Sequence, residues 1–230
     1  MTTNLFDVID TTWPAVRVIE QGVWHLREGA GGGKRVSAVT LHGQLPRDLP
    51  EAALFSVRED QNDLDQMLAD RGYRVVDPSV IFSCPIETVA KNQIPRITAF
   101  DVWPPFEIMC AIWDAGGIGS ERRDVMARAT CEKTSILGRI NGRAAGTCYA
   151  GLHQAVTMVH ALEILAQHRR FGLARHMMAL AAKWGQKRGS DTFSVVTTES
   201  NEPAKALYSA LGMSIVGRYH YRMKPDEGRA

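Results

Sequence analysis

The residues most suited to binding or chemistry lie in one short segment, from Leu162 to Arg175. An apolar stretch ends at Leu165, an arginine-rich turn follows, and small residues then open a helical pattern. The first backbone N–H groups of a helix have no partner inside the helix, and the helix dipole adds positive potential there. Because such an N-terminus binds phosphate groups, the segment predicts a cradle for a diphosphate.

The residue types in this turn favour close approach of an anion. Gly172 and Ala174 have little or no side chain, so a phosphate can reach the main chain. Positive charge surrounds them, from Arg169, Arg170 and Arg175. A helix is expected over Gly172 to Arg188, because its apolar residues fall on one stripe and Gly189 follows.

Two other glycine-rich stretches do not make nucleotide sites. Gly33-Lys34 is followed by Arg35, where a P-loop needs Ser or Thr, and a strand rather than a helix is expected over Arg35 to Leu41. Gly117-Ile118-Gly119 begins like a dinucleotide fingerprint, but Arg122 stands at the third glycine position. The turn before Gly172 therefore remains the one candidate for phosphate binding.

The pattern Arg169-x-x-Gly172-x-Ala174 resembles the acetyl-CoA signature of the GNAT superfamily of N-acetyltransferases, Arg/Gln-x-x-Gly-x-Gly/Ala. A strand is expected before it and an amphipathic helix after it, which is the context that the signature requires. The segment Asn201 to Met213 is similar to the family's Asn-x-x-Ala-x-x-Leu-Tyr-x-x-x-Gly-Phe, with Met213 replacing the aromatic residue. The chain also departs from the family at Arg170, often Gly, and Ala166, often Pro, and neither change removes a phosphate donor. The resemblance covers about residues 96 to 224.

The resemblance implies direct transfer of an acetyl group from acetyl-CoA, as co-substrate, to a primary amine, without a metal. The strand Leu162 to Leu165 would bind the pantetheine arm through its backbone and offer an N–H to the thioester oxygen. The residues that the resemblance places at the cofactor are Leu162, Ile164, Leu165, Arg169, Arg170, Phe171, Gly172, Leu173, Ala174, Arg175 and Asn201. Asn201 has a second interpretation, as the N-cap of the helix that follows it.

Such a reaction needs a base for the amine and an acid for the leaving sulfur. Glu163 is the expected general base, acting through water, with an ordinary polar residue on a solvated face as the alternative. His160 and Glu199 are further candidates for the base. Tyr208 is expected to protonate the leaving sulfur, since a phenol keeps its proton at pH 7. A core tyrosine on the helix face is the alternative for Tyr208.

The order of expected elements over residues 96 to 224 is β-α-α-β-β-β-α-β-α-β. That order predicts an α/β (α+β) fold of the GNAT type, with a mixed central sheet flanked by helices. A polar stretch at residues 85–95 suggests a boundary, with a smaller α/β subdomain over residues 1–90. Its Leu54–Val57, helix and Gly72–Val76 echo Ser194–Thr197, helix and Gly212–Val216 at an offset of 140 residues. Residues 1–90 are therefore interpreted as a reduced copy without the cofactor turn, and two unrelated strand–helix–strand units are the alternative.

Composition narrows the function classes. The chain has 230 residues, 45% hydrophobic and 23% charged, as in ordinary globular domains. A net charge of +2, with basic residues confined to one turn, argues against a nucleic-acid partner. No apolar run reaches the ~20 residues of a membrane span, and Asp7 and Asp10 stand where a signal peptide carries positive charge.

We therefore expect a cytoplasmic protein with four reduced thiols and neither a membrane nor a metal partner, since no CxxC or HxxxH spacing occurs. The expected partner is a small-molecule or peptide amine, bound by residues 103–128 and the N-terminal part, and a homodimer stays open. In the same region Trp103, Phe106 and Trp113 are interpreted as core residues rather than as a pocket. A non-catalytic module that binds acetyl-CoA or CoA is the alternative function.

Overall fold

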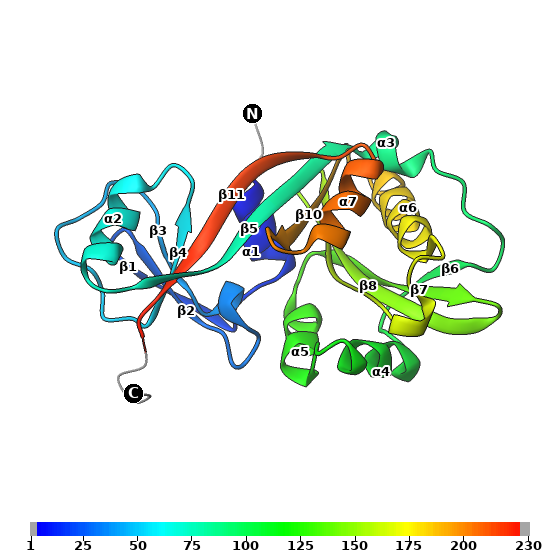
Figure 1. Ribbon diagram of the computed structural model, residues 1–230, viewed down its shortest axis with the longest axis horizontal. Helices are drawn as coiled ribbons and strands as arrows, with labels where there is room; N and C mark the ends of the chain where they lie inside the picture. Colours follow the sequence, from blue (N-terminus) through cyan, green and yellow to red (C-terminus); the bar gives the residue numbers. More distant parts are fainter. Residues whose placement is uncertain (1–3, 226–230) are drawn as a thin grey trace.

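The computed structural model describes residues 4–225, which form one mixed sheet of eleven strands with helices on both faces (Figure 1). The first half contains α1 (Leu5–Thr12), β1 (Arg17–Gln21), β2 (Trp24–Glu28), β3 (Val39–Leu41), β4 (Leu54–Arg58), α2 (Asn62–Asp70), β5 (Arg74–Pro85) and α3 (Ile86–Ala90). The second half contains β6 (Ala99–Val102), α4 (Glu107–Ala115), α5 (Ser120–Arg128), β7 (Glu132–Ile140), β8 (Arg143–His153), β9 (Val156–Ile164), α6 (Leu173–Gln186), β10 (Thr192–Thr198), α7 (Glu202–Ala210) and β11 (Ser214–Met223). The strand order is β1-β2-β3-β4-β11-β5-β10-β9-β8-β7-β6.

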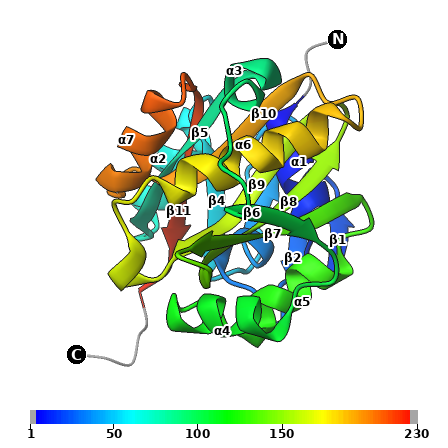
Figure 2. The same ribbon diagram turned by 90° about the vertical axis from the view of Figure 1, so that its right-hand side faces the viewer.

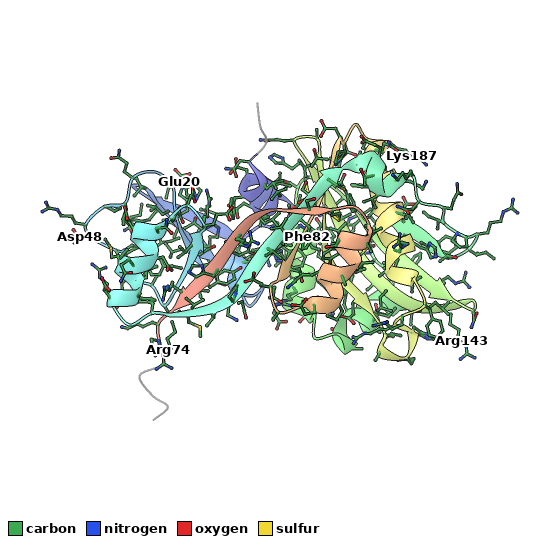
Figure 3. All side chains as sticks on the ribbon, turned by 45° about the horizontal axis from the view of Figure 1, so that its top comes forward. Glu20, Asp48, Arg74, Phe82, Arg143 and Lys187 are labelled. Atoms are coloured by element: carbon green, nitrogen blue, oxygen red, sulfur yellow. The ribbon has the colours of Figure 1, made fainter. Side chains whose placement is uncertain are left out.

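The two halves exchange their last strands. β5 pairs antiparallel with β10 of the second half, and β11 pairs antiparallel with β4 of the first. β5 and β11 also pair with each other at the centre of the sheet. Figure 1 shows these two long strands running between the ends of the molecule, and Figure 3 places Arg74 and Phe82 of β5 at one end and near the centre. Ladder hydrogen bonds therefore join the halves into one sheet.

The two halves contain equivalent helix–strand units, separated by the offset of 140 residues seen in the sequence. α2 spans 62–70 and α7 spans 202–210, while β5 begins at 74 and β11 at 214. In both halves the strand before this unit is parallel to its neighbour, β3 to β4 and β9 to β10. Residues 42–53 contain no helix, whereas the fourteen-residue α6 joins β9 to β10. The first half thus has the equivalent strands and helix but no counterpart of α6, the helix whose N-terminus would bind phosphate.

Helices cover both faces of the second half of the sheet (Figure 2). Along β8, Cys148 and Ala150 pack in the cluster that contains α6, and Tyr149 packs in the cluster that contains Trp113 of α4. Neighbouring strand residues point to opposite faces, so α6 and α4 lie on opposite sides of the sheet. This arrangement leaves the end of β9 accessible between the helix layers.

Two local differences from the sequence expectation, and the accommodation of Pro78 inside the sheet, have physical causes. Residues 35–38 are not strand: backbone bonds from Val36 to Gly33 and from Ala38 to Lys34 close a turn, although the polar–apolar alternation imitates a strand. Pro78 lies in a central strand that bends, with φ +47° at Asp77 and a register shift opposite Tyr219 and Tyr221. Such irregularities accommodate proline inside a sheet. The sequence interpretation also missed α1, β1 and α3, which are short.

A charged cluster ties α2 to the exchanged strand β11. The Asp65 carboxylate accepts hydrogen bonds from Arg222 Nε and Nη2, both at 2.7 Å, and lies 2.6 Å from His220 Nε2. The bond from Arg222 lowers the pKa of Asp65 below its ordinary value. A lowered carboxyl pKa stabilises the fold above the ordinary pKa, and this stability is lost as pH falls through the lowered value.

We expect Asp65→Asn to reduce the free energy of unfolding by about 1–2 kcal/mol at pH 7, measured by urea denaturation. The difference from the wild type should begin to shrink below about pH 4, where the Asp65 carboxyl of the unfolded chain takes up a proton, and should be lost as pH falls through the lowered pKa of the folded state. Asp63→Asn is the control, because Asp63 lies in the same first turn of α2 and forms no ion pair within residues 4–225. Equal losses in the two variants would assign the effect to the helix dipole rather than to Arg222.

Candidate active site

A cavity of about 430 Å³ opens where β9 and β10 separate. The two strands are paired from Val156–Val159 and Thr192–Val195 only. Beyond that point β9 lines one side with His160, Ala161 and Leu162, and β10 lines the other with residues 196–198. The backbone edges that face each other across this gap lack a strand partner, so they can bind an extended ligand.

A β-bulge re-aims β9 at the mouth of the gap. The register against β8 shifts between Tyr149 and Thr147, and Ala161 has φ +52°. The Ala161 carbonyl accepts a hydrogen bond from Trp113 Nε1 at 2.8 Å, which fixes the bulge against α4. Bulges of this kind redirect side chains and interrupt ladder pairing. Of the expected strand residues, Leu162 lines the cavity, whereas Ile164 packs against the core and the Leu165 N–H bonds to the Ala145 carbonyl at 2.9 Å.

The turn before α6 has the backbone shape of an anion cradle. Arg170 and Gly172 have positive φ angles, +71° and +78°, and Gly172 caps α6 without a side-chain bond. Within residues 4–225, the N–H groups of Phe171, Gly172, Leu173 and Ala174 donate no hydrogen bond. A Cβ built on Gly172 meets nothing within 4 Å, so the space over the turn is open. The expected donors are therefore free to bind a ligand.

Two of the arginines around the cradle brace it. Arg169 Nη2 lies 3.0 Å from the Glu163 carboxylate, and its Nε donates to the Ile164 carbonyl at 3.0 Å. Arg175 Nη2 donates to the Ala210 carbonyl at the end of α7, at 3.4 Å. Arg170 and Phe171 are exposed. Arg169 therefore connects the end of β9 to the turn.

Glu163 lies on the α4 side of the sheet, opposite Ile164. Gly116 makes room for it, because a Cβ at Gly116 would lie 2.5 Å from the carboxyl carbon. Its side chain is only 17% exposed and pairs with Arg169. Glu163 is not among the residues that line the cavity. Its role as a base through water stays a prediction, and the role it has in the structure is to hold Arg169.

Tyr208 of α7 lines the cavity and is 4% exposed. Its ring packs against Phe82 with 5.4 Å between centroids, and its hydroxyl forms no hydrogen bond within residues 4–225. Burial raises the pKa of Tyr208 above its ordinary value, so the phenol is protonated at neutral pH. Asn201 also lines the cavity, and its Oδ1 caps α7 by accepting from the Ala204 N–H at 3.2 Å.

His160 is held in a hydrogen-bonded chain. The Thr12 hydroxyl donates to the Val8 carbonyl at 2.7 Å, so it accepts from His160 Nε2 at 2.8 Å. The other ring nitrogen, Nδ1, then accepts from Arg35 Nη1 at 3.1 Å. Burial, with Arg35 beside it, holds the pKa of His160 well below its ordinary value. Both nitrogens are occupied, which disfavours His160 as the base, and Glu199 is exposed outside the cavity wall.

The first half supplies part of the cavity wall that the sequence interpretation did not assign to particular residues. These residues are Trp13, Gly32, Gly33, Lys34, Arg35, Asp77 and Ser79. Tyr219 and Tyr221 of the exchanged strand β11 complete it, and their i, i+2 spacing on a strand was the available signal.

Residues 103–128, the segment expected to bind the acceptor, contribute non-aromatic residues to the cavity wall. Ile118 and Arg122 reach the cavity. Trp113 is buried in the core as expected, Trp103 packs against the same core under Lys133, and Phe106 is 55% exposed.

Among residues 4–225, His, Cys, Asp and Glu side chains nowhere gather in a group of three that could hold a metal. None of the described helices is both long and apolar enough to cross a membrane.

Comparisons with known proteins bear on the family and the fold of the chain. Residues 103–213 match the acetyltransferase (GNAT) family. A curated relative from Bacillus subtilis (strain 168), the uncharacterized N-acetyltransferase YobR, is 24% identical over 240 residues, covering 93% of this chain and 94% of the relative. A GCN5-related N-acetyltransferase structure from Kribbella flavida has a TM-score of 0.72 at 16% identity, with 96% and 94% of the two chains covered. A tandem GNAT protein from the clavulanic acid biosynthesis pathway has a TM-score of 0.58 at 12% identity, with 96% and 87% covered.

Residues 103–213 are a domain of the acetyltransferase (GNAT) family, and the described chain has the fold of GNAT structures. The family match lies inside the region in which the sequence resemblance was found, residues 96 to 224. The expected mixed α/β fold, with one large sheet flanked by helices, is confirmed.

Proposed function

We propose that the protein transfers an acetyl group from acetyl-CoA to a primary amine. The observation that carries this proposal is the pairing of two features at the end of β9. One is the row of unpaired amides at Phe171–Ala174, and the other is the cavity that begins at Leu162 and contains Tyr208. Phosphates at the amides would leave the pantetheine arm to extend along the open edge of β9 towards the cavity.

In the proposed reaction a neutral amine attacks the thioester carbon. A C–N bond forms, the C–S bond breaks, the amine proton passes to a base, and the Tyr208 phenol gives its proton to the leaving sulfur. A backbone N–H at the bulge of β9 would stabilise the oxyanion. Glu163 through water remains our proposal for the base, and Asp77 is the one carboxylate on the cavity wall among the described residues.

The pH dependence of kcat/KM distinguishes Glu163 from Asp77 as the base. We expect Glu163→Gln to lower kcat on the order of 100-fold and to remove the acidic limb of the profile, with Asp77→Asn as the matched variant. CoA affinity is measured in both, because Glu163 also holds Arg169. Loss of that limb in Asp77→Asn alone would move the base to Asp77.

The transferase itself is tested by calorimetry with CoA and by acetyl-CoA-dependent thiol release over an amine library, with products identified by mass. We expect CoA to bind and at least one amine to be acetylated. CoA binding without transfer to any amine would favour the alternative of a non-catalytic CoA-binding module.

We also propose that residues 1–90 are a degenerate copy of the domain in residues 96–224. The matching bounds of α2 and α7, the exchange of β5 and β11, and the likeness of fold to a tandem GNAT protein support this. The copy without a cradle then serves the other half by closing its acceptor cavity.

A further inference from the structure

Arg35 is a partly buried cation on the wall of the large cavity. It is the middle residue of the turn over residues 34–36, and it lines the large cavity together with Tyr219 and Tyr221. Its Nη1 donates to His160 Nδ1 at 3.1 Å, and its Nε is buried without a hydrogen-bond partner. The Tyr219 and Tyr221 hydroxyls also interact with the guanidinium, which is therefore fixed in position by neutral groups, and only its Nε is without a partner.

No charge within residues 4–225 neutralises Arg35. It forms an ion pair with no carboxylate, whereas the neighbouring Lys34 is paired with Asp77 at 2.9 Å. His160 is neutral, because burial and Arg35 hold its pKa well below the ordinary value. Burial raises the pKa of Tyr221, so its phenol is neutral as well. A cation that is partly removed from water and has no opposite charge beside it is available to pair with an anion supplied by a ligand.

The cavity wall as a whole is cationic. Lys34, Arg35 and Arg122 face it, against the single carboxylate of Asp77. A simple alkyl ammonium would be repelled from such a wall, whereas an amine that also carries an anion would be attracted. CoA phosphates bound at the free amides of residues 171–174 would not neutralise this positive charge, because those residues are not part of the cavity wall.

We propose that the acceptor is an amine that bears a carboxylate, of amino-acid size, and that Arg35 binds this carboxylate. The inference rests on the proposed acetyl transfer. The planar guanidinium pairs with two carboxylate oxygens, and the Tyr219 and Tyr221 hydroxyls beside it can donate to the same group. A cavity of about 430 Å³ has room for a small acceptor together with the acetyl end of the cofactor.

The test uses matched pairs of ligands on the full chain. Calorimetry measures binding of N-acetylated amino acids, as product probes, and of their C-terminal amides, with CoA present. Turnover is measured with the parent amino acids, their amides and the corresponding aminophosphonates. The variants are Arg35→Gln and Arg35→Lys, and Arg122→Gln is the control because Arg122 is an exposed cation on the same wall.

We expect the wild type to prefer the carboxylate over its amide on the order of 30-fold or more, and Arg35→Gln to lose this preference with CoA affinity unchanged. Arg35→Lys should recover part of it, and Arg122→Gln should change it less than about threefold. Tm is measured for each variant, because Arg35→Gln also removes the hydrogen bond to His160 Nδ1; the carboxylate preference recovered by Arg35→Lys, which keeps the charge, separates the lost pairing from a disturbed fold. A stronger preference for phosphonates would show that the anion is not a carboxylate.

Failure of this inference and failure of the transferase proposal look different. Equal binding of carboxylates and amides by the wild type would overturn the role of Arg35, even with rapid acetylation of some amine. A drop in kcat for all amines in Arg35→Gln, with product binding unchanged, would also overturn it and move Arg35 to the oxyanion. Selective product binding without turnover would support the role of Arg35 and contradict acetyl transfer.

Discussion

Gly172→Glu should weaken CoA binding by at least about 100-fold. The substitution places a carboxylate over the four free amides that open α6, where the helix dipole favours anions and a diphosphate would bind. Because nothing lies within 4 Å of a Cβ built at this position, the new side chain occupies the open cradle itself. Isothermal titration with CoA measures the effect directly and does not depend on the acceptor.

Gly189→Glu is a matched control at the other end of the same helix. Gly189 has φ +84° against +78° at Gly172, and a Cβ there also meets nothing within 4 Å. Both substitutions therefore cost a similar strain of about 1–2 kcal/mol from the left-handed backbone. We expect the two variants to lose similar amounts of stability. CoA affinity should stay unchanged in Gly189→Glu and fall in Gly172→Glu. If both variants bind CoA as the wild type does, the diphosphate binds elsewhere.

The cradle could be predicted from the sequence because it depends on local rules. A strand, a turn with Gly172 and a helix follow each other within one short segment, and backbone amides at a helix start need no distant residue to point outward. The same holds for Tyr208 and Asn201, since helix periodicity and capping place them on α7. The offset between the halves was also visible, because strand–helix–strand spacing is local.

The cavity wall could not be predicted in this way, because it is made by pairing between distant strands. Tyr221 reaches the cavity only because β11 pairs with both β4 and β5. Arg35 lies opposite His160, 125 residues further along the chain. Local patterns were also misleading there, since the alternation over residues 35–38 is typical of a strand and the structure has a turn. The residues of the proposed cofactor site could therefore be predicted from local sequence, whereas those of the proposed acceptor site depend on long-range pairing and could not.

Tyr208→Phe should lower kcat by about 100- to 1,000-fold and leave CoA affinity within about threefold of the wild type. The Tyr208 phenol lies on the cavity wall and burial raises its pKa, so it carries a proton at neutral pH that it can give to the leaving sulfur. Phenylalanine keeps the packing against Phe82 and removes only the hydroxyl. Burst and steady-state rates of thiol release measure the change.

Tyr208→Phe is not expected to disturb folding. The Tyr208 hydroxyl has no hydrogen-bond partner within residues 4–225, so its removal should change the free energy of unfolding by less than about 1 kcal/mol. Tyr73→Phe is the opposite case, because the Tyr73 hydroxyl donates to the Ala52 carbonyl at 2.6 Å outside the cavity. We expect Tyr73→Phe to lose stability and keep kcat. A Tyr208→Phe enzyme with kcat within threefold of the wild type would mean that the thiolate leaves without a protein acid, and that the buried phenol serves only to pack α7 on β5.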